Sequence, residues 1–258
     1  KIVQAVLVLC RFRHKLRLLQ GFCVSGEISG SIIFLVEHTN TQKSWFYGSL
    51  ISMSGSSGAL LASFAVYITS LSFMPDWAWR VPFLLNFPII FIGIYIRRNV
   101  SESPVFKLYC HQNRIKIPLI KILKEFRKSI LLTFLGAAFV GILSSMIIVY
   151  LNIYLQKKLG SQISNIYALS SISLISYIIS CPLAGYCSYK YDFRKVMVFG
   201  ALGTIITALY ILFFQGQYSS LVIYSQVICL GIFAASYSAP FNTFMVFLFP
   251  PNVRYSGS

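Results

Sequence analysis

The chain has 258 residues, of which 57% are hydrophobic and only 11% are Asp, Glu, Lys or Arg. This composition excludes a soluble domain of this size and predicts an all-α protein that crosses a lipid bilayer several times. The formal net charge of +16 would suggest nucleic acid as the partner of a soluble protein. Here most basic residues lie between apolar runs of membrane-spanning length, so we expect the bilayer, and no nucleic acid, as the partner.

The N-terminal part of the chain contains the first predicted span. Residues 1–16 are difficult to assign, because the apolar stretch 2–10 leads into a basic cluster and is shorter than the roughly 20 residues of a spanning helix. This stretch is either the end of a preceding helix or the displaced start of the next one. The first span is predicted at residues 17–36, with Arg17 and Glu27 at or within an otherwise small and apolar helix.

The second and third spans are predicted at residues 45–71 and 80–95. The second contains Gly48, Gly55 and Gly58 among several serines, and small residues let helices approach closely in lipid. We therefore expect this face to pack on a neighbouring helix. Three aromatic residues are typical of a belt at one membrane interface: Tyr67, Trp77 and Trp79.

A basic segment, residues 97–128, separates two apolar halves of the chain. It holds nine of the 22 Lys and Arg residues, and its last part, 118–128, places apolar residues at helical spacing beside lysines. That pattern predicts a short amphipathic helix on the membrane surface, with its apolar face in the headgroups and its lysines toward anionic lipid. An ordinary solvated charge run remains the alternative interpretation.

The second apolar half contains four predicted spans, at residues 129–154, 163–186, 196–214 and 221–249. If the basic segment is cytoplasmic, that side of the membrane receives 14 Lys and Arg residues. The other side receives Lys157 and Lys158, or three with Arg80 at its boundary. The positive-inside rule therefore predicts a multi-pass protein of the inner (plasma) membrane with a cytoplasmic basic segment, although the basic residues near the N-terminus oppose this orientation.

The sequence shows no catalytic or metal-binding constellation. The six cysteines lack paired metal-type spacing, and we expect them to be packing residues that form neither a disulfide framework nor a zinc site. A nucleophile with a base, a phosphate-binding glycine loop and a His/Cys cluster are all missing from the sequence. We therefore expect no enzymatic activity, no metal and no cofactor.

Short motifs recur in order along almost the whole chain. They are RLLQGF at 17–22 with GE at 26–27 and Glu37, WRVPF at 79–83, RR at 97–98 with ESPVF at 102–106, and FP at 249–250 with VRYSG at 253–257. In this order and spacing they resemble the major facilitator superfamily. The resemblance is greatest to its metabolite:proton symporter branch, which includes proline/betaine, shikimate and dicarboxylate carriers.

The resemblance implies helices four to ten of a twelve-helix carrier. Residues 1–96 would end the first helix bundle, 97–128 would form the cytoplasmic loop between bundles, and 129–258 would begin the second bundle. The chain, which starts at Lys1, is then expected to be a fragment whose missing helices come from flanking sequence. The implied function is proton-coupled symport of a small polar metabolite or osmolyte by alternating access.

Two alternatives to this function stay open. In the first alternative, the chain is a truncated or degenerate carrier without transport activity. In the second, it is a carrier of another subfamily, such as a sugar or drug transporter. The first alternative concerns activity. The second predicts the same fold and differs only in the substrate.

Charged residues inside a predicted span are candidates for proton coupling, because a charge near a helix centre costs about 2.5–3.5 kcal/mol on insertion scales. Glu27 would accept and release the coupling proton, or it would be a structural carboxylate hydrogen-bonded to serines of a neighbouring helix. By resemblance, Arg17 is the fourth-helix arginine linked to proton transfer or substrate binding. A snorkelling residue at headgroup level is the alternative for Arg17. Gln20, in the same motif, is assigned to the same path.

The resemblance also implies residues for helix packing and gating. Glu37 is similar to the carboxylate that ties its helix to a glycine-aspartate loop absent here, so we expect it to be unpaired. The second-half counterpart of that loop falls at 185–195, where Tyr189 replaces the family's aspartate and Asp192 stands at a glycine position. The usual gating salt bridge of this loop thus lacks its aspartate, unless Asp192, three residues away, takes its place. The predicted set is Gly21, Gly26, Glu37, Gly55, Gly58, Gly185, Lys190, Asp192 and Arg194.

The later spans carry few charges, so a solute path through them would be polar and aromatic. Hydroxyl and amide groups would hydrogen-bond the solute, and aromatic rings would bind a quaternary ammonium group by cation–π contact. Hydrogen bonds that pack helices together are the alternative use of these groups. The candidates are Tyr150, Asn152, Tyr154, Ser170, Ser171, Ser173, Tyr237, Ser238 and Asn242.

Overall fold

The structure is a computed structural model that describes residues 2–40, 43–69, 71, 73–75, 77–99, 118–150, 153, 166–213, 220–250 and 254. Its main helices are α1 (Ile2–Glu37), α2 (Ser44–Thr69), α3 (Val81–Leu84), α4 (Asn86–Asn99), α6 (Pro118–Glu125), α7 (Arg127–Ser145), α9 (Ile166–Lys190), α10 (Phe193–Phe213) and α11 (Ser220–Phe247). A 3-10 turn at Ala78–Arg80 precedes α3, and a π-helical turn at Met146–Tyr150 extends α7. The described residues thus form a helical protein, as predicted.

The membrane spans follow the sequence prediction. Among the described residues, seven helical stretches are long and apolar enough to cross a membrane. They are Lys15–Glu37, Ser44–Thr69, Ala78–Ile96, Arg127–Tyr150, Ser171–Lys190, Phe193–Ile211 and Val222–Phe247. The seven predicted spans are therefore confirmed, with their boundaries shifted by several residues.

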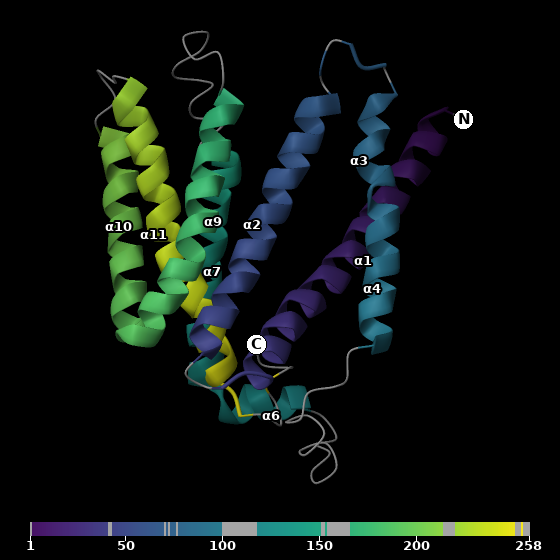
Figure 1. The fold of residues 1–258 in the computed structure, drawn as a ribbon. Helices are drawn as coiled ribbons and strands as arrows, with labels where there is room; N and C mark the ends of the chain where they lie inside the picture. The colour runs from purple at the N-terminus through teal and green to yellow at the C-terminus, as the bar shows by residue number, and fades with distance from the viewer. Residues whose placement is uncertain are drawn as a thin grey trace.

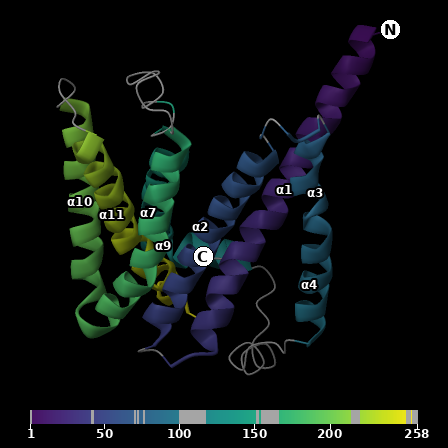
Figure 2. The same cartoon turned by 45° about the horizontal axis from the view of Figure 1, so that its top comes forward.

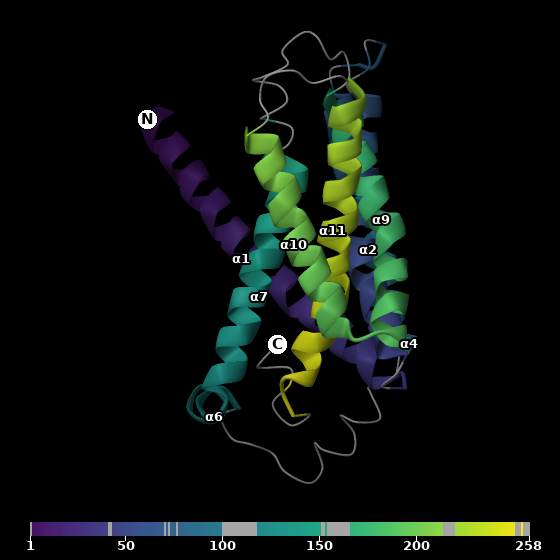
Figure 3. The same cartoon turned by 90° about the vertical axis from the view of Figure 1, so that its left-hand side faces the viewer.

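Helix α1 starts earlier than predicted. The stretch 1–16, which could not be assigned from its sequence, belongs from Ile2 onward to the same continuous helix as the first span. At 1.5 Å per residue this helix is roughly 54 Å long, which exceeds the about 30 Å thickness of a bilayer core. Its N-terminal part projects away from the other helices (Figure 3).

The helices are close together at one end of the molecule and diverge toward the other end. In Figure 1, α7, α9, α10 and α11 lie on one side, α1, α3 and α4 lie on the other, and α2 runs between them. Figure 2 shows the same divergence from a tilted view. The exposure of the α2 side chains changes along the helix in agreement with this divergence. Ser44 and Ser49 are buried, whereas Leu61 and Phe64, farther along the helix, are exposed.

Two apolar clusters hold this arrangement together. One joins α7, α9 and α11, with Leu143, Cys181 and Leu230 at its centre, and Met53 of α2 packs against it. The other joins the last turns of α1 to α11, through residues such as Ile33. Helix α1 therefore packs, through its C-terminal part, against α11, which belongs to the group formed by α7, α9, α10 and α11.

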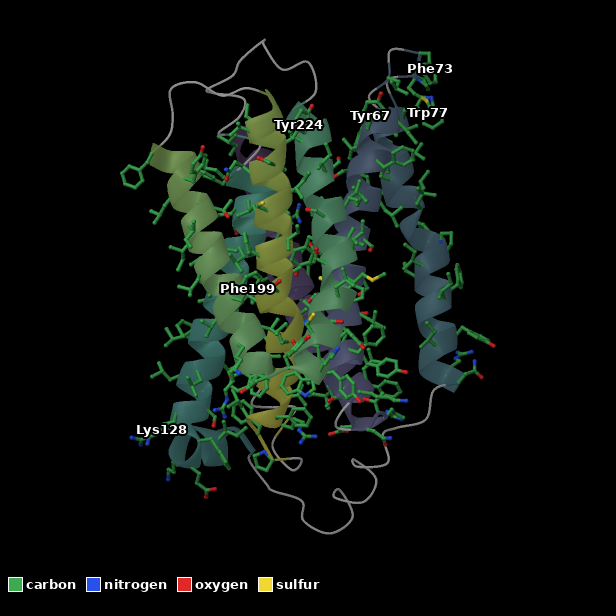
Figure 4. All side chains as sticks on the ribbon, turned by 60° about the vertical axis from the view of Figure 1, so that its left-hand side comes forward. Tyr67, Phe73, Trp77, Lys128, Phe199 and Tyr224 are labelled. Atoms are coloured by element: carbon green, nitrogen blue, oxygen red, sulfur yellow. The ribbon has the colours of Figure 1, made fainter. Side chains whose placement is uncertain are left out.

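The two ends of the bundle differ in chemistry. Lys128 lies at the end where the helices meet, and Tyr67, Phe73 and Trp77 lie at the opposite end (Figure 4). We call the first end the basic end; it carries the exposed Lys43, Lys124, Arg127, Lys128, Lys190 and Arg194. An accumulation of basic residues at one end matches the positive-inside distribution across a membrane.

Candidate functional site

The predicted proton-coupling residues lie on an exposed face of α1. Arg17, Gln20 and Glu27 are all exposed, and the Arg17 guanidinium donates a hydrogen bond of 3.0 Å to Gln20 Oε1. The backbone carbonyl of Glu27 accepts a hydrogen bond of 2.8 Å from Ser31. Among the described residues, no ion-pair partner faces the Glu27 carboxylate. The described helices thus do not bring Glu27 to the serines of α2, and its proton-coupling role stays a prediction.

A polar cluster lies where α2, α9 and α11 meet, and we call Ser52, Tyr177, Ser238 and Asn242 the inter-helix cluster; Tyr177 and Ser238 are buried, and Ser52 and Asn242 are partly buried. Asn242 Nδ2 donates a hydrogen bond of 2.8 Å to Ser52 Oγ. The hydroxyls of Tyr177 and Ser238 are 2.5 Å apart. Tyr177 also interacts with Ser52 and with Cys181. These groups satisfy one another without any formal charge, which allows them to be buried at low cost.

The inter-helix cluster sits inside the bundle, away from the basic end. Ser52 is eight residues beyond Ser44, the start of α2, which corresponds to about 12 Å along a helix axis. Next to the cluster, the Tyr237 ring makes an edge contact with Phe139 at 4.6 Å and stacks on Phe241 at 5.9 Å between ring centroids. A solute that reached this depth would therefore meet hydroxyl, amide and aromatic groups together.

The basic end is closed by an ion pair between distant parts of the chain. Arg254 Nη1 lies 3.0 Å from Glu37 Oε1, and the two side chains are only 12% and 6% exposed. The expectation that Glu37 is unpaired is therefore wrong. Arg254 Nε also donates a hydrogen bond of 3.3 Å to the carbonyl of Phe249. The pair thus ties the end of α1 to the segment that follows α11.

Close backbone packing closes the same end of the bundle. Gly185 of α9 lies so near α2 that a methyl group added there would overlap the side chain of Ser49. Gly48 of α2 meets Thr243 of α11 in the same way, and Thr243 Oγ1 donates a hydrogen bond of 3.1 Å to the carbonyl of Ser44. These contacts leave no room for larger residues, so the packing depends on small side chains at both positions.

The other predicted gating residues occupy local positions. Asp192 directly precedes α10 and accepts a hydrogen bond of 3.0 Å from the Arg194 backbone N–H, which makes it the N-cap of that helix. The Lys190 and Arg194 side chains lie over the Tyr191 and Phe193 rings, each at 5.6 Å from the centroid. In the part of the chain that the structure describes, these residues lie near their own helix ends and do not contact Glu37.

The remaining predicted residues are placed as follows. Gly21, Gly55 and Gly58 have no described atom within 4 Å of an added Cβ, so their packing role stays a prediction, as does that of the partly buried Gly26. Tyr150 lines a mostly apolar cavity of about 520 Å³ between α7 and α10. Asn152 and Tyr154 lie outside the described residues, as does the side chain of Ser170; Ser171 is partly buried and Ser173 buried.

Sequence reasoning missed two features of this region. Tyr177 and Cys181 lie one helical turn apart on the buried face of α9, but an apolar run with scattered serines gives no sign of which tyrosine is buried. Arg254 was part of a motif, yet nothing local relates it to Glu37, 217 residues earlier. Only the packing of α1 against α11 brings the two together.

Comparison with known proteins identifies the family. A model described as Major Facilitator Superfamily matches residues 6–258. The chain belongs to the Major Facilitator Superfamily. This member is 27% identical over 250 residues to a putative proline/betaine transporter of Staphylococcus aureus (strain COL), covering 93% of this chain and 53% of that protein.

Two further relatives of this superfamily member carry similar names. A putative proline/betaine transporter of Staphylococcus haemolyticus (strain JCSC1435) is 28% identical, over 93% of this chain and 52% of its own length. The proline/betaine transporter of Escherichia coli (strain K12) is 23% identical, over 93% of this chain and 51% of its own length. The chain thus spans about half the length of these relatives, consistent with the predicted fragment of a larger carrier.

Membership in this superfamily makes the chain a multi-pass membrane protein related to transporters. The predicted family is confirmed, and with it the all-α, helix-bundle fold class. The predicted division into residues 1–96, 97–128 and 129–258 stays a prediction. The ion pair and the glycine contacts at the basic end join helices from the first and last of these parts.

Proposed function

We propose that this chain is part of a secondary active transporter that moves a small polar metabolite or osmolyte together with protons. The observation that carries the proposal is the closed basic end, where the Glu37–Arg254 ion pair joins helices of the two predicted halves. Alternating access requires such an end to open and close as the halves rock against each other. An ion pair between the halves is a contact that this motion would break and restore.

The conformation fits a carrier that is closed on one side of the membrane. Ser44 and Ser49 of α2 are buried at the basic end, whereas Phe64 and Tyr67 near the other end are exposed. The distribution of basic residues favours the cytoplasm for the basic end and the inner (plasma) membrane for the protein. On this assignment we propose that the conformation is closed toward the cytoplasm.

The inter-helix cluster supports a solute without a large net charge. Ser52, Ser238 and Asn242 offer neutral hydrogen-bonding groups, and Tyr177 and Tyr237 offer aromatic rings beside them. Tyrosine faces attract quaternary ammonium groups through cation–π contact. The names of the relatives agree with this chemistry, and we assign the proline/betaine class of osmolyte as the first choice, with organic acids second.

Elimination favours Glu27 as the proton carrier. The chain has only six acidic residues, and of these Glu27 and Glu37 lie within candidate spans. Glu37 is paired with Arg254. The inter-helix cluster carries no carboxylate. Among the acidic residues of this chain, Glu27 is therefore the one that we propose couples the proton, with Arg17 and Gln20 on the same helix.

Proton-driven uptake tests this function. Membrane vesicles with the chain as written, and with the chain completed by the flanking helices of a full-length carrier, would be supplied with labelled betaine, proline or a dicarboxylate under a pH gradient. We expect Glu27→Gln to abolish uptake at an unchanged protein level, and Glu125→Gln, outside the spans, to leave it intact. Uptake by the completed chain that is indifferent to the pH gradient and to Glu27→Gln would refute proton coupling through Glu27.

The length of the chain relative to its relatives and the position of Glu27 also favour the alternative that this chain does not transport without further helices. It spans about half of its relatives, and Glu27 lies on a face that the described helices leave uncovered. The same uptake experiment separates the two cases. Activity only in the completed chain would identify the chain as an incomplete carrier, and uptake of sugars or drugs instead would assign another subfamily.

A further inference from the structure

Helix α6 is not explained by transport. It lies across the basic end of the bundle (Figures 1 and 3). Only Phe126 separates it from α7, whose first residue, Arg127, is also the start of a candidate span. The end of a span lies at the bilayer surface, so α6 is held at the level of the lipid headgroups whatever the rest of the protein does.

One edge of the apolar face of α6 is covered by protein. Ile122 is 3% exposed and packs against Phe249, beyond the end of α11. The Phe126 ring lies 6.4 Å from the Phe249 ring between centroids. This contact fixes the rotation of α6 about its own axis. It also corrects the sequence prediction that the whole apolar face lies in the headgroups.

The other edge of the helix is uncovered and amphipathic. Leu123, beside Ile122, is 53% exposed. Lys124, Arg127 and Lys128 are exposed as well, and Lys128 points away from the bundle (Figure 4). An exposed leucine with three neighbouring cations, at headgroup depth, has the composition of an interfacial helix on an anionic membrane.

We propose that α6 and the first turn of α7 dock on the anionic phospholipid headgroups of the basic side. Leu123 enters the boundary between headgroups and acyl chains, and Lys124, Arg127 and Lys128 lie among the lipid phosphates. Each basic side chain near an anionic surface contributes about a five-fold gain in binding. The inference does not depend on the transport function, because it rests only on α6 and its position at the end of a span.

Hydrogen–deuterium exchange of the whole chain in lipid nanodiscs tests the docking. Amides of residues 119–127 would be compared between nanodiscs of phosphatidylcholine alone and nanodiscs that also contain phosphatidylglycerol. We expect exchange to slow several-fold with phosphatidylglycerol, and high salt to remove the difference. Equal exchange in the two lipids at low salt would overturn the proposal.

Matched variants separate docking by α6 from a general charge effect. Replacing Lys124, Arg127 and Lys128 by Gln should abolish the difference between the lipids. Replacing Lys190, Arg194 and Lys195 by Gln removes the same charge from the same end of the bundle and should keep it. An equal loss in both triple variants would overturn the assignment to α6.

A third variant, Leu123→Asn, tests insertion without changing charge. It should speed exchange of this segment in both lipids, and unchanged exchange would refute insertion of Leu123. Unaltered exchange in α9 and α11 would show for every variant that the bundle is intact.

Discussion

Loss of the Glu37–Arg254 ion pair should open the basic end. Removing one partner of a fully buried pair costs about 3–5 kcal/mol, because it leaves the other charge unpaired. This pair is 12% and 6% exposed and lies at the end of the bundle, where water reaches a freed side chain. We therefore expect Glu37→Gln to cost the closed state about 2 kcal/mol, a shift of about 30-fold in the ratio of open to closed molecules.

Labelling of a buried cysteine measures that shift. Ser49 is buried against Gly185 in the closed state, so Ser49→Cys, with the six native cysteines replaced by alanine, reports opening through its reaction with a water-soluble maleimide. The rate should rise about 30-fold in Glu37→Gln, in line with the shift in population. Glu125→Gln, which removes an exposed carboxylate at the same end, should leave the rate unchanged.

Exchanging the two charges distinguishes the effect of losing the ion pair from the separate effect of each substitution. Glu37→Arg with Arg254→Glu should return the labelling rate toward that of the parent chain, because the ion pair can form again in the opposite direction. The reasoning would be refuted if Glu37→Gln and Arg254→Gln left the rate unchanged. It would also be refuted if the exchanged pair behaved as the sum of two independent losses.

Three further predictions concern stability and are checked by thermal unfolding in detergent. Gly185→Leu should lower the free energy of unfolding by about 1–3 kcal/mol, because the new side chain overlaps α2. The same substitution at Gly55, which lies in open space, should not lower it, since leucine has the higher helix propensity; equal losses would refute the close contact. Asp192→Ala should cost about 1 kcal/mol through the lost N-cap, and Asp192→Asn, which keeps the cap, should not. Tyr177→Phe should cost about 1–2 kcal/mol by leaving Ser238 without its hydroxyl partner, and no loss would argue against the inter-helix cluster.

The sequence predicts the spans well because each is a local property. A stretch of about 20 apolar residues must be helical in a bilayer, where every backbone group needs an internal partner. The start of α1 was different. Charges at Arg11, Arg13 and Lys15 lower the hydropathy of the first turns, although the backbone continues as one helix through them. Hydropathy therefore located the span but not the beginning of the helix.

The candidate site was predicted less completely, because its contacts join residues far apart in sequence. The sequence predicts Ser238 and Asn242 from their chemistry, but their partners Tyr177 and Ser52 follow only from the crossing of α2, α9 and α11. The N-cap role of Asp192 could be predicted from the local sequence, since an aspartate before a helical run is a common N-cap. Its position in a family motif favoured a gating interpretation instead.

Closure of the basic end and proton coupling through Glu27 differ in how much of the carrier they require. The contacts that close the basic end are present within it, since Glu37, Arg254, Ser49 and Gly185 all meet their partners in the described helices. The Glu27 carboxylate has no ion-pair partner there, and the relatives are about twice as long as the segment they share with this chain. We therefore expect the gate variants to alter labelling in the chain as written. Glu27→Gln should change a measured function only after the flanking helices are supplied.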